Sequence, residues 1–242
     1  MTAPLGSRLL RWAASAVETA ADENVANIER LMPSAGDGAF VDLGCDDGEL
    51  TVRVAEHAGA GEIHGVEAVE ERARLASERG VDVKIADLNE PLPYEDDRFA
   101  VVFSNQVIEH LRDTTLFVRE IHRVLRPGGH AIVSSENLAS WHNIFSLFAG
   151  WQPFSLTNVS YEHGGLGNPL ALHRGESFEW KSWEHVRVFA YRGLADLFRV
   201  NGFDVETTAG AGYFPLPARV GRWDPRHAAY ITVKARKAEP PA

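Results

Sequence analysis

Cysteine is nearly absent from the chain, and Cys45 is the only one among 242 residues. A single thiol excludes an internal disulfide framework and a zinc site made of four cysteines. It fits a reducing compartment, and we therefore expect a cytoplasmic protein. Long apolar runs are also absent: none approaches the roughly 20 residues that a helix needs to cross a bilayer, so no membrane span is expected.

Positive charge is in deficit. Lysine and arginine total 24 against 34 aspartate and glutamate residues, which gives a formal net charge of −10. A polyanion would have to bind against this field, so nucleic acid is not expected as a partner. Hydrophobic residues make up 45% of the chain, which is enough for an apolar core in one large domain or two small ones.

The order of the apolar runs predicts an α/β fold. Residues 1–37 carry apolar side chains at helical spacing and are expected to form one or two helices. From 38 to 135, short β-rich runs alternate with helical stretches, which indicates right-handed βαβ units and a doubly wound, mostly parallel sheet. Residues 188–242 resume the pattern with one helix and two strands, which we expect to complete this sheet.

The alternation stops at an insertion after the fifth strand, residues 136–187, which holds four of the six tryptophans. We expect this aromatic-rich insertion to bury its rings against the sheet or around a ligand. It is therefore the candidate lid over an acceptor pocket. The alternative is a second hydrophobic core that stabilises the edge of the sheet.

Residues suited to ligand binding follow the first predicted strands. In an open parallel sheet, ligands bind beyond the carboxyl ends of the strands. The loop at residues 42–48 contains Gly44 and Gly48, which allow a tight turn and a close approach of the backbone to a ligand. Glu67 ends the second strand roughly twenty residues later, where a carboxylate can accept both hydroxyls of a ribose.

The next two strand ends continue this series. Asp87 follows the third strand and can accept an exocyclic amine, and Leu88 beside it can pack against a flat ring. Asn105 follows the fourth strand. A polar group at each of four consecutive strand ends indicates one ligand site better than it indicates four unrelated surface residues.

Five sequence blocks resemble those of class I S-adenosylmethionine-dependent methyltransferases that act on small molecules. They are residues 41–48, 65–67, 86–88, 105–111 and 123–130, the last with Val-Leu-Arg-Pro-Gly-Gly before a strand. The likeness is close from residue 38 to 135 and loose over the last helix and two strands. It implies an enzyme with a Rossmann-like fold, a seven-stranded, mostly parallel sheet, and S-adenosyl-L-methionine as cofactor.

The resemblance also implies roles for individual residues. The cofactor-binding residues would be Asp42 and Gly44 at the methionine half, Cys45 and Gly48 in the same loop, Glu67 at the ribose, Asp87 and Leu88 at the adenine, and Asn105 near the amino and carboxylate groups. The family usually has glycine where this chain has Asp46. We expect that side chain to point away from the cofactor.

Methyl transfer from a sulfonium is an in-line displacement, which needs an aligned acceptor and the exclusion of water. The acidic chain and the aromatic insertion favour a small, partly apolar acceptor that is methylated on oxygen. His110, preceded by Glu109, is the best-placed catalytic base because it follows the fourth strand and histidine suits proton transfer near neutral pH. The other histidines in or beside the insertion are His142, His163, His173 and His185.

Residues 106–110 are similar to the acidic-x-x-Glu-His segment of ubiquinone-type O-methyltransferases, where it is associated with a divalent metal. Gln106 stands in place of the first carboxylate. One hard ligand is therefore missing, and we expect no bound metal.

Two other functions stay open. A non-catalytic, methyltransferase-like partner subunit would use the aromatic insertion as an interaction surface. A nicotinamide-dependent Rossmann oxidoreductase would need a Gly-x-Gly-x-x-Gly turn, which residues 44–48 do not supply. The oligomeric state does not follow from the sequence.

Overall fold

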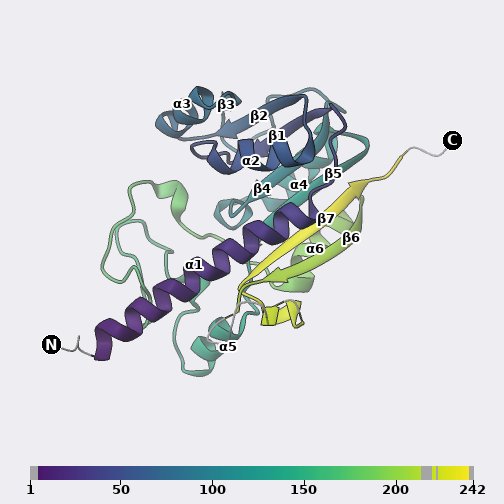
Figure 1. The fold of residues 1–242 in the computed structure, drawn as a ribbon. Helices are drawn as coiled ribbons and strands as arrows, with labels where there is room; N and C mark the ends of the chain where they lie inside the picture. The colour runs from purple at the N-terminus through teal and green to yellow at the C-terminus, as the bar shows by residue number, and fades with distance from the viewer. Residues whose placement is uncertain (1–4, 214–219, 222, 240–242) are drawn as a thin grey trace.

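The fold is built around a seven-stranded sheet with the strand order β3-β2-β1-β4-β5-β7-β6 (Figure 1). The computed structural model describes residues 5–213, 220–221 and 223–239, of which residues 5–14 and Lys181 are described by their backbone alone. The strands are β1 (Ala39–Leu43), β2 (Glu62–Glu67), β3 (Asp82–Ile85), β4 (Phe99–Asn105), β5 (Leu125–Glu136), β6 (Phe203–Ala211) and β7 (Tyr230–Lys237).

The strands from β3 to β5 pair in parallel, and β7 runs antiparallel between β5 and β6. The predicted mostly parallel sheet is thereby confirmed. The first six residues of β4 are all buried, because a central parallel strand is covered on both faces and reads as a continuous apolar run. β3 lies at one edge and is mostly exposed.

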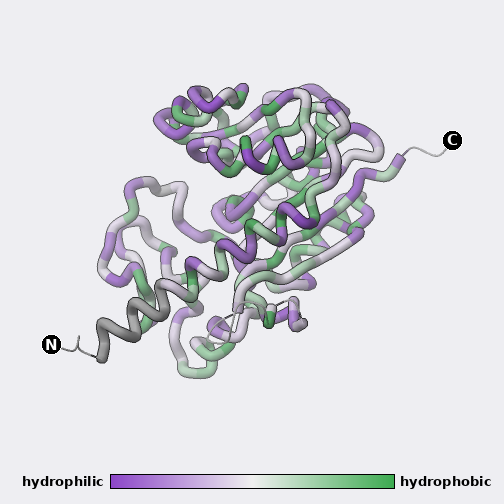
Figure 2. The backbone as a smooth tube through the Cα atoms, in the orientation of Figure 1, coloured by the Kyte–Doolittle hydropathy of each residue, from purple (hydrophilic) through white to green (hydrophobic). Residues whose placement is uncertain are grey.

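Helices cover both faces of the sheet, as a doubly wound fold requires. They are α1 (Leu5–Leu31), α2 (Glu49–Ala58), α3 (Glu70–Glu78), α4 (Thr114–Val124) and α6 (Tyr191–Val200), whereas α5 (Trp141–Phe148) belongs to the insertion after β5. One hydrophobic core joins α1 and α2 to the sheet around Ile28, Val54 and Phe103, and another joins α4 and α6 to it around Phe117 and Phe198. Figure 2 shows hydrophobic residues along the strands and more hydrophilic ones on the outer helices.

The N-terminal segment forms the single helix α1, one of the two forms expected. It crosses the sheet and contacts β5, β6 and β7 (Figure 1). Asn24, Ile28 and Leu31 are spaced along one buried side of this helix. Within the described part of the chain, no helix is long and apolar enough to cross a membrane.

The insertion between β5 and α6 leaves its tryptophans partly exposed. None of its four tryptophans is fully buried, and the side chains of Trp141 and Trp183 are 44% and 39% exposed. Its interior is polar instead: the buried Asn143 amide donates to the Asn137 carbonyl and to the Ser155 hydroxyl. A segment with little regular structure must satisfy its buried backbone with side-chain groups. These polar groups occupy part of the interior, and the tryptophan rings remain partly exposed.

Candidate active site

A cavity of about 960 Å³ lies at the carboxyl ends of the first four strands. It collects predicted residues that are far apart in the chain, which is the placement that parallel topology dictates. The predicted residues in its wall are Asp42, Gly44, Cys45, Glu67, Asp87, Leu88, Asn105 and His110. Gly48 and Glu109 do not line it.

The two glycines of the first loop have steric tasks. Both have positive φ, 86° at Gly44 and 82° at Gly48, a conformation that side chains rarely adopt. A Cβ on Gly44 would collide with Val107, and one on Gly48 would lie 2.8 Å from the Cα of Ala76. Gly48 therefore packs α2 against α3 and supports the cavity from outside its wall. Cys45 is buried, its thiol packs beside Gly65, and the residue lines the cavity.

Asp46 has a backbone conformation that suits the glycine expected at its position. Its φ is 48°, a left-handed conformation that aspartate tolerates better than most residues. Its amide donates to the Glu67 Oε2 at 3.0 Å, and its carboxylate pairs with Arg72 at 3.3 Å. The side chain is 63% exposed. The ion pair offsets the negative charge that Asp46 adds beside the cavity.

Glu67 is held in one orientation by the backbone. Its Oε1 accepts the Val69 amide at 2.8 Å, and its Oε2 accepts the Asp46 amide at 3.0 Å. A carboxylate offers about four acceptor positions, so each oxygen keeps one for a ligand. This is the pattern needed to bind two adjacent hydroxyls.

Two further groups fit the other parts of the expected cofactor. Leu88 is buried at the cavity wall, and the exposed Asp87 accepts the Asn89 amide at 2.9 Å. Asp42 is buried; one of its oxygens accepts the Thr51 hydroxyl at 2.7 Å, and the other has no partner among the described residues. Burial raises the pKa of Asp42 to about 8. A cationic ligand amino group would supply the missing partner and favour the ionised carboxylate.

Asn105 is held by a residue that the sequence reasoning missed. Asn24 of α1 is 3% exposed and donates to the Asn105 Oδ1 at 3.0 Å. The Asn24 Oδ1 in turn accepts the Ser134 hydroxyl at 3.0 Å. The network ties α1 to the ends of β4 and β5. One feature of the sequence could have pointed to Asn24: it is a polar residue four positions before Ile28, on the apolar stripe of the helix.

His110 lines the cavity as a neutral ring. Its Nδ1 lies 3.0 Å from the Glu184 carbonyl, which can only accept, so Nδ1 carries the proton and Nε2 has the free lone pair. Its ring meets that of His185 edge to face, with centroids 4.7 Å apart. Burial, with a smaller effect from His185, lowers the pKa of His110 to about 4.

Glu109 was predicted to act with His110, yet the structure places it beneath the cavity. Its side chain is fully buried; one oxygen accepts the Ser135 hydroxyl at 3.0 Å, and the other has no partner among the described residues. Burial and then the nearby Glu136 raise the pKa of Glu109 to about 8. Its carbonyl accepts the amides of Val186 and Arg187. Glu109 therefore anchors the end of the insertion and does not face an acceptor.

Glu109, His110 and His185 offer ligand atoms that all lie within 4.8 Å of one another. Two imidazoles and one carboxylate form a donor set for zinc or a similar transition metal, whereas magnesium prefers oxygen. The set does not fit the divalent cation associated with the acidic-x-x-Glu-His segment, because Gln106 stands in place of the first carboxylate of that segment.

Comparisons with known proteins agree with this geometry. Residues 41–133 match the family described as "Methyltransferase domain". A probable S-adenosylmethionine-dependent methyltransferase of Mycolicibacterium smegmatis is 36% identical over 80% of this chain and 64% of its own length. The mitochondrial ubiquinone biosynthesis O-methyltransferase of Rattus norvegicus is 23% identical over 73% of this chain and 47% of its own. The chain thus spans less than two thirds of these curated relatives.

Solved structures share the fold. A possible histamine N-methyltransferase from Thermotoga maritima superimposes with a TM-score of 0.63 and 20% identity, and 96% of each chain is covered. The sheet, the cavity at its strand ends and the match over residues 41–133 show that the chain contains a class I S-adenosylmethionine-dependent methyltransferase domain. The cofactor of this family is S-adenosyl-L-methionine. This assignment replaces the nicotinamide-dependent alternative.

Proposed function

We propose that the protein moves the methyl group of S-adenosylmethionine to an oxygen of a small, partly apolar metabolite, with His110 as the base. The position of His110 in the cavity wall, with its Nδ1 held by the Glu184 carbonyl, is the observation that carries this proposal. A base must be unprotonated before the reaction, and a pKa near 4 leaves this imidazole neutral at physiological pH. The O-methyltransferase name of the rat relative supports oxygen as the acceptor atom.

The cofactor would lie across the four strand ends. Glu67 would accept the ribose hydroxyls, and Leu88 and Asp87 would contact the adenine face and amine. The orphaned oxygen of Asp42 supports placement of the amino group there, and Asn105, fixed by Asn24, would border the methionine end. The bound cofactor supplies an electrophilic methyl group. The protein has to align the acceptor with it and exclude water.

We assign four parts to the chain: the helical segment 1–37, the cofactor-binding core 38–135, the lid 136–187 and the sheet-completing part 188–242. Ser182, Trp183, Glu184 and Val186 line the cavity, which supports the lid role. Trp183 and Val186 offer apolar surface, which suits an acceptor that is partly apolar. The carbonyl that fixes His110 belongs to Glu184, so lid position and base orientation would change together.

A panel of acceptors tests this function. Phenols, catechols and primary amines of similar size would be incubated with methyl-labelled S-adenosylmethionine, and labelled product would be counted. We expect product from hydroxyl acceptors. With the best acceptor, His110→Ala should lower kcat by about 10² to 10⁴ while the cofactor Kd stays nearly constant.

His163→Ala is the matched control, because His163 is an exposed histidine of the same insertion. It should keep the wild-type kcat. Wild-type turnover in a folded His110→Ala protein would remove His110 as the base. Product from amines alone would overturn the choice of oxygen.

A further inference from the structure

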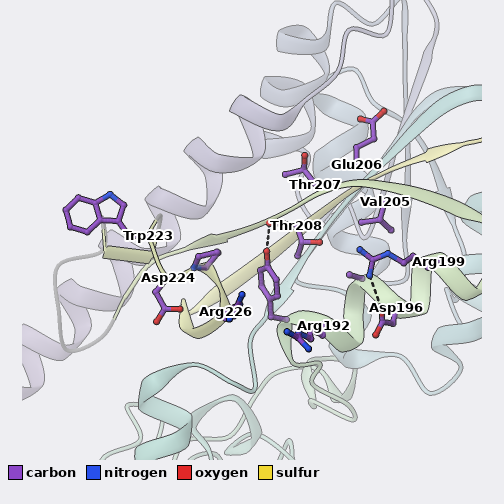
Figure 3. A pocket seen from close by; sticks show the side chains of 13 residues that line it. Arg192, Asp196, Arg199, Val205, Glu206, Thr207, Thr208, Trp223, Asp224 and Arg226 are labelled. Atoms are coloured by element: carbon purple, nitrogen blue, oxygen red, sulfur yellow. Dashed lines mark hydrogen bonds and ion pairs between the residues drawn. The ribbon is translucent and has the colours of Figure 1, made fainter.

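A second cavity of about 840 Å³ lies between α6, β6 and residues 223–226 (Figure 3). It shares no wall residue with the cofactor cavity. Its wall contains three arginines, Arg192, Arg199 and Arg226, together with the hydroxyl residues Thr207 and Thr208. The same wall holds three carboxylates, Asp196, Glu206 and Asp224.

Two of the three acidic residues of this wall have a cationic partner: Asp196 pairs with Arg199 at 2.7 Å, and Glu206 with Lys234 at 3.5 Å. Arg199 is therefore occupied by its own partner. Asp224 accepts the Tyr213 hydroxyl at 2.6 Å and contacts the His227 ring at 2.9 Å, and it remains a carboxylate in the same wall as Arg192 and Arg226.

Among the described residues, neither Arg192 nor Arg226 has a side-chain hydrogen bond or ion-pair partner. Residues 214–219 and 222 contain no acidic side chain that could supply one. Figure 3 shows Arg192 and Arg226 toward the same end of the cavity. Arg226 also acts electrostatically on the hydroxyl of Tyr191, the residue next to Arg192, so the two charges share one region. Both side chains are exposed, and with the Asp224 carboxylate in the same wall the surplus there is one positive charge.

The start of α6 adds to this field. The helix begins at Tyr191, and Ala190 at its N-cap makes no side-chain capping bond. The first amides of a helix have no acceptor within the helix, and its dipole is positive at this end. Backbone amides beside two free guanidinium groups form a strong recognition pattern for a tetrahedral dianion.

The edge strand β6 also borders the cavity, so an added peptide strand must be considered. The register of β6 shifts between Val205 and Thr207, within the segment that lines the cavity. Such a bulge interrupts the regular edge that another strand would need. We propose that this cavity binds a small phosphorylated molecule, with its phosphoryl group between Arg192, Arg226 and the first turn of α6.

Calorimetric titration of the full chain with inorganic pyrophosphate tests the site. Arg192→Gln and Arg226→Gln should each weaken binding by roughly 10- to 100-fold, the range for hydrogen bonds to a charged group. Arg126→Gln is the matched control, because Arg126 is exposed, has no ion-pair partner among the described residues and lies outside the cavity. The control should bind within about twofold of wild type.

Melting temperatures would establish that each variant is folded, and Arg192→Lys and Arg226→Lys, which keep the charge, should retain part of the affinity. Equal weakening in all three glutamine variants would mean a response to net charge alone, and would overturn the site. The absence of saturable binding to wild type would do the same. Succinate binding more tightly than pyrophosphate would overturn the assignment to a phosphoryl group.

Discussion

Replacement of Glu67 by alanine should weaken cofactor binding through loss of contacts to the ribose. Two acceptor positions of this carboxylate are filled by the amides of Asp46 and Val69, and about two remain for the ligand hydroxyls. A hydrogen bond to a charged group contributes about 1.5 to 3 kcal/mol. We therefore expect the Kd for S-adenosylhomocysteine, the demethylated product, to rise by about 10- to 150-fold in Glu67→Ala.

Part of that loss would come from the loop, because Glu67 also orients the amide of Asp46. A thermodynamic cycle separates the two causes. The 2′-deoxy analogue of S-adenosylhomocysteine should bind wild type more weakly than the parent compound does, whereas Glu67→Ala should bind both within about twofold. Calorimetry gives the four dissociation constants, for two proteins with two ligands. Glu70→Ala removes the same charge from an exposed position nearby and should behave as wild type.

Additive losses would refute the reasoning. If the 2′-deoxy analogue is penalised as much in Glu67→Ala as in wild type, the carboxylate does not contact the hydroxyl. Glu67 would then be a loop-structuring residue only.

Three further predictions concern other parts of the site. Asn24→Ala should raise the cofactor Kd several-fold. Asn24→Asp should not restore the affinity, because a carboxylate cannot donate a hydrogen bond to the Asn105 Oδ1. A wild-type Kd in both variants would contradict a role of this network in cofactor binding. Burial raises the pKa of Glu109 to about 8, so the native state binds more protons than the unfolded state between about pH 4 and pH 8, and the free energy of unfolding should fall as pH rises through that window. Denaturant titrations should show that the free energy of unfolding of Glu109→Gln falls less over this pH range than that of wild type. An equal fall in the two proteins would contradict the prediction. Arg72 pairs with Asp46 and lies 5.4 Å from the Trp180 ring centroid, so it should link the lid to the cofactor loop. Arg72→Ala should therefore increase the hydrogen exchange of residues 180–186. Unchanged exchange would argue against this link.

The strand-end residues could be predicted because topology alone brings them together. Parallel strands end at one edge, so Asp42, Glu67, Asp87 and Asn105 needed only the alternation of strands and helices to be placed near one another. Local backbone signals, such as Gly44 at its tight turn, added detail. No contact between distant segments had to be known.

The remaining parts depend on how separate segments dock. Asn24 reaches Asn105 only because α1 crosses the ends of β4 and β5, and His185 reaches His110 only because the insertion returns to the cavity. Periodicity in the sequence carries no information on either docking. The polar interior of the insertion could not be predicted for a related reason, since residue type alone does not reveal that Asn143 and its polar neighbours fill this space.

The central claim is that the cavity at the strand ends binds S-adenosylmethionine in a catalytic protein. A calorimetric titration of the wild-type chain with S-adenosylmethionine tests it most directly. We predict saturable binding to a single site, in competition with S-adenosylhomocysteine. A folded protein that gives no binding heat at several temperatures, and no protection of residues 42–48 from hydrogen exchange, would contradict the account and favour a non-catalytic partner subunit.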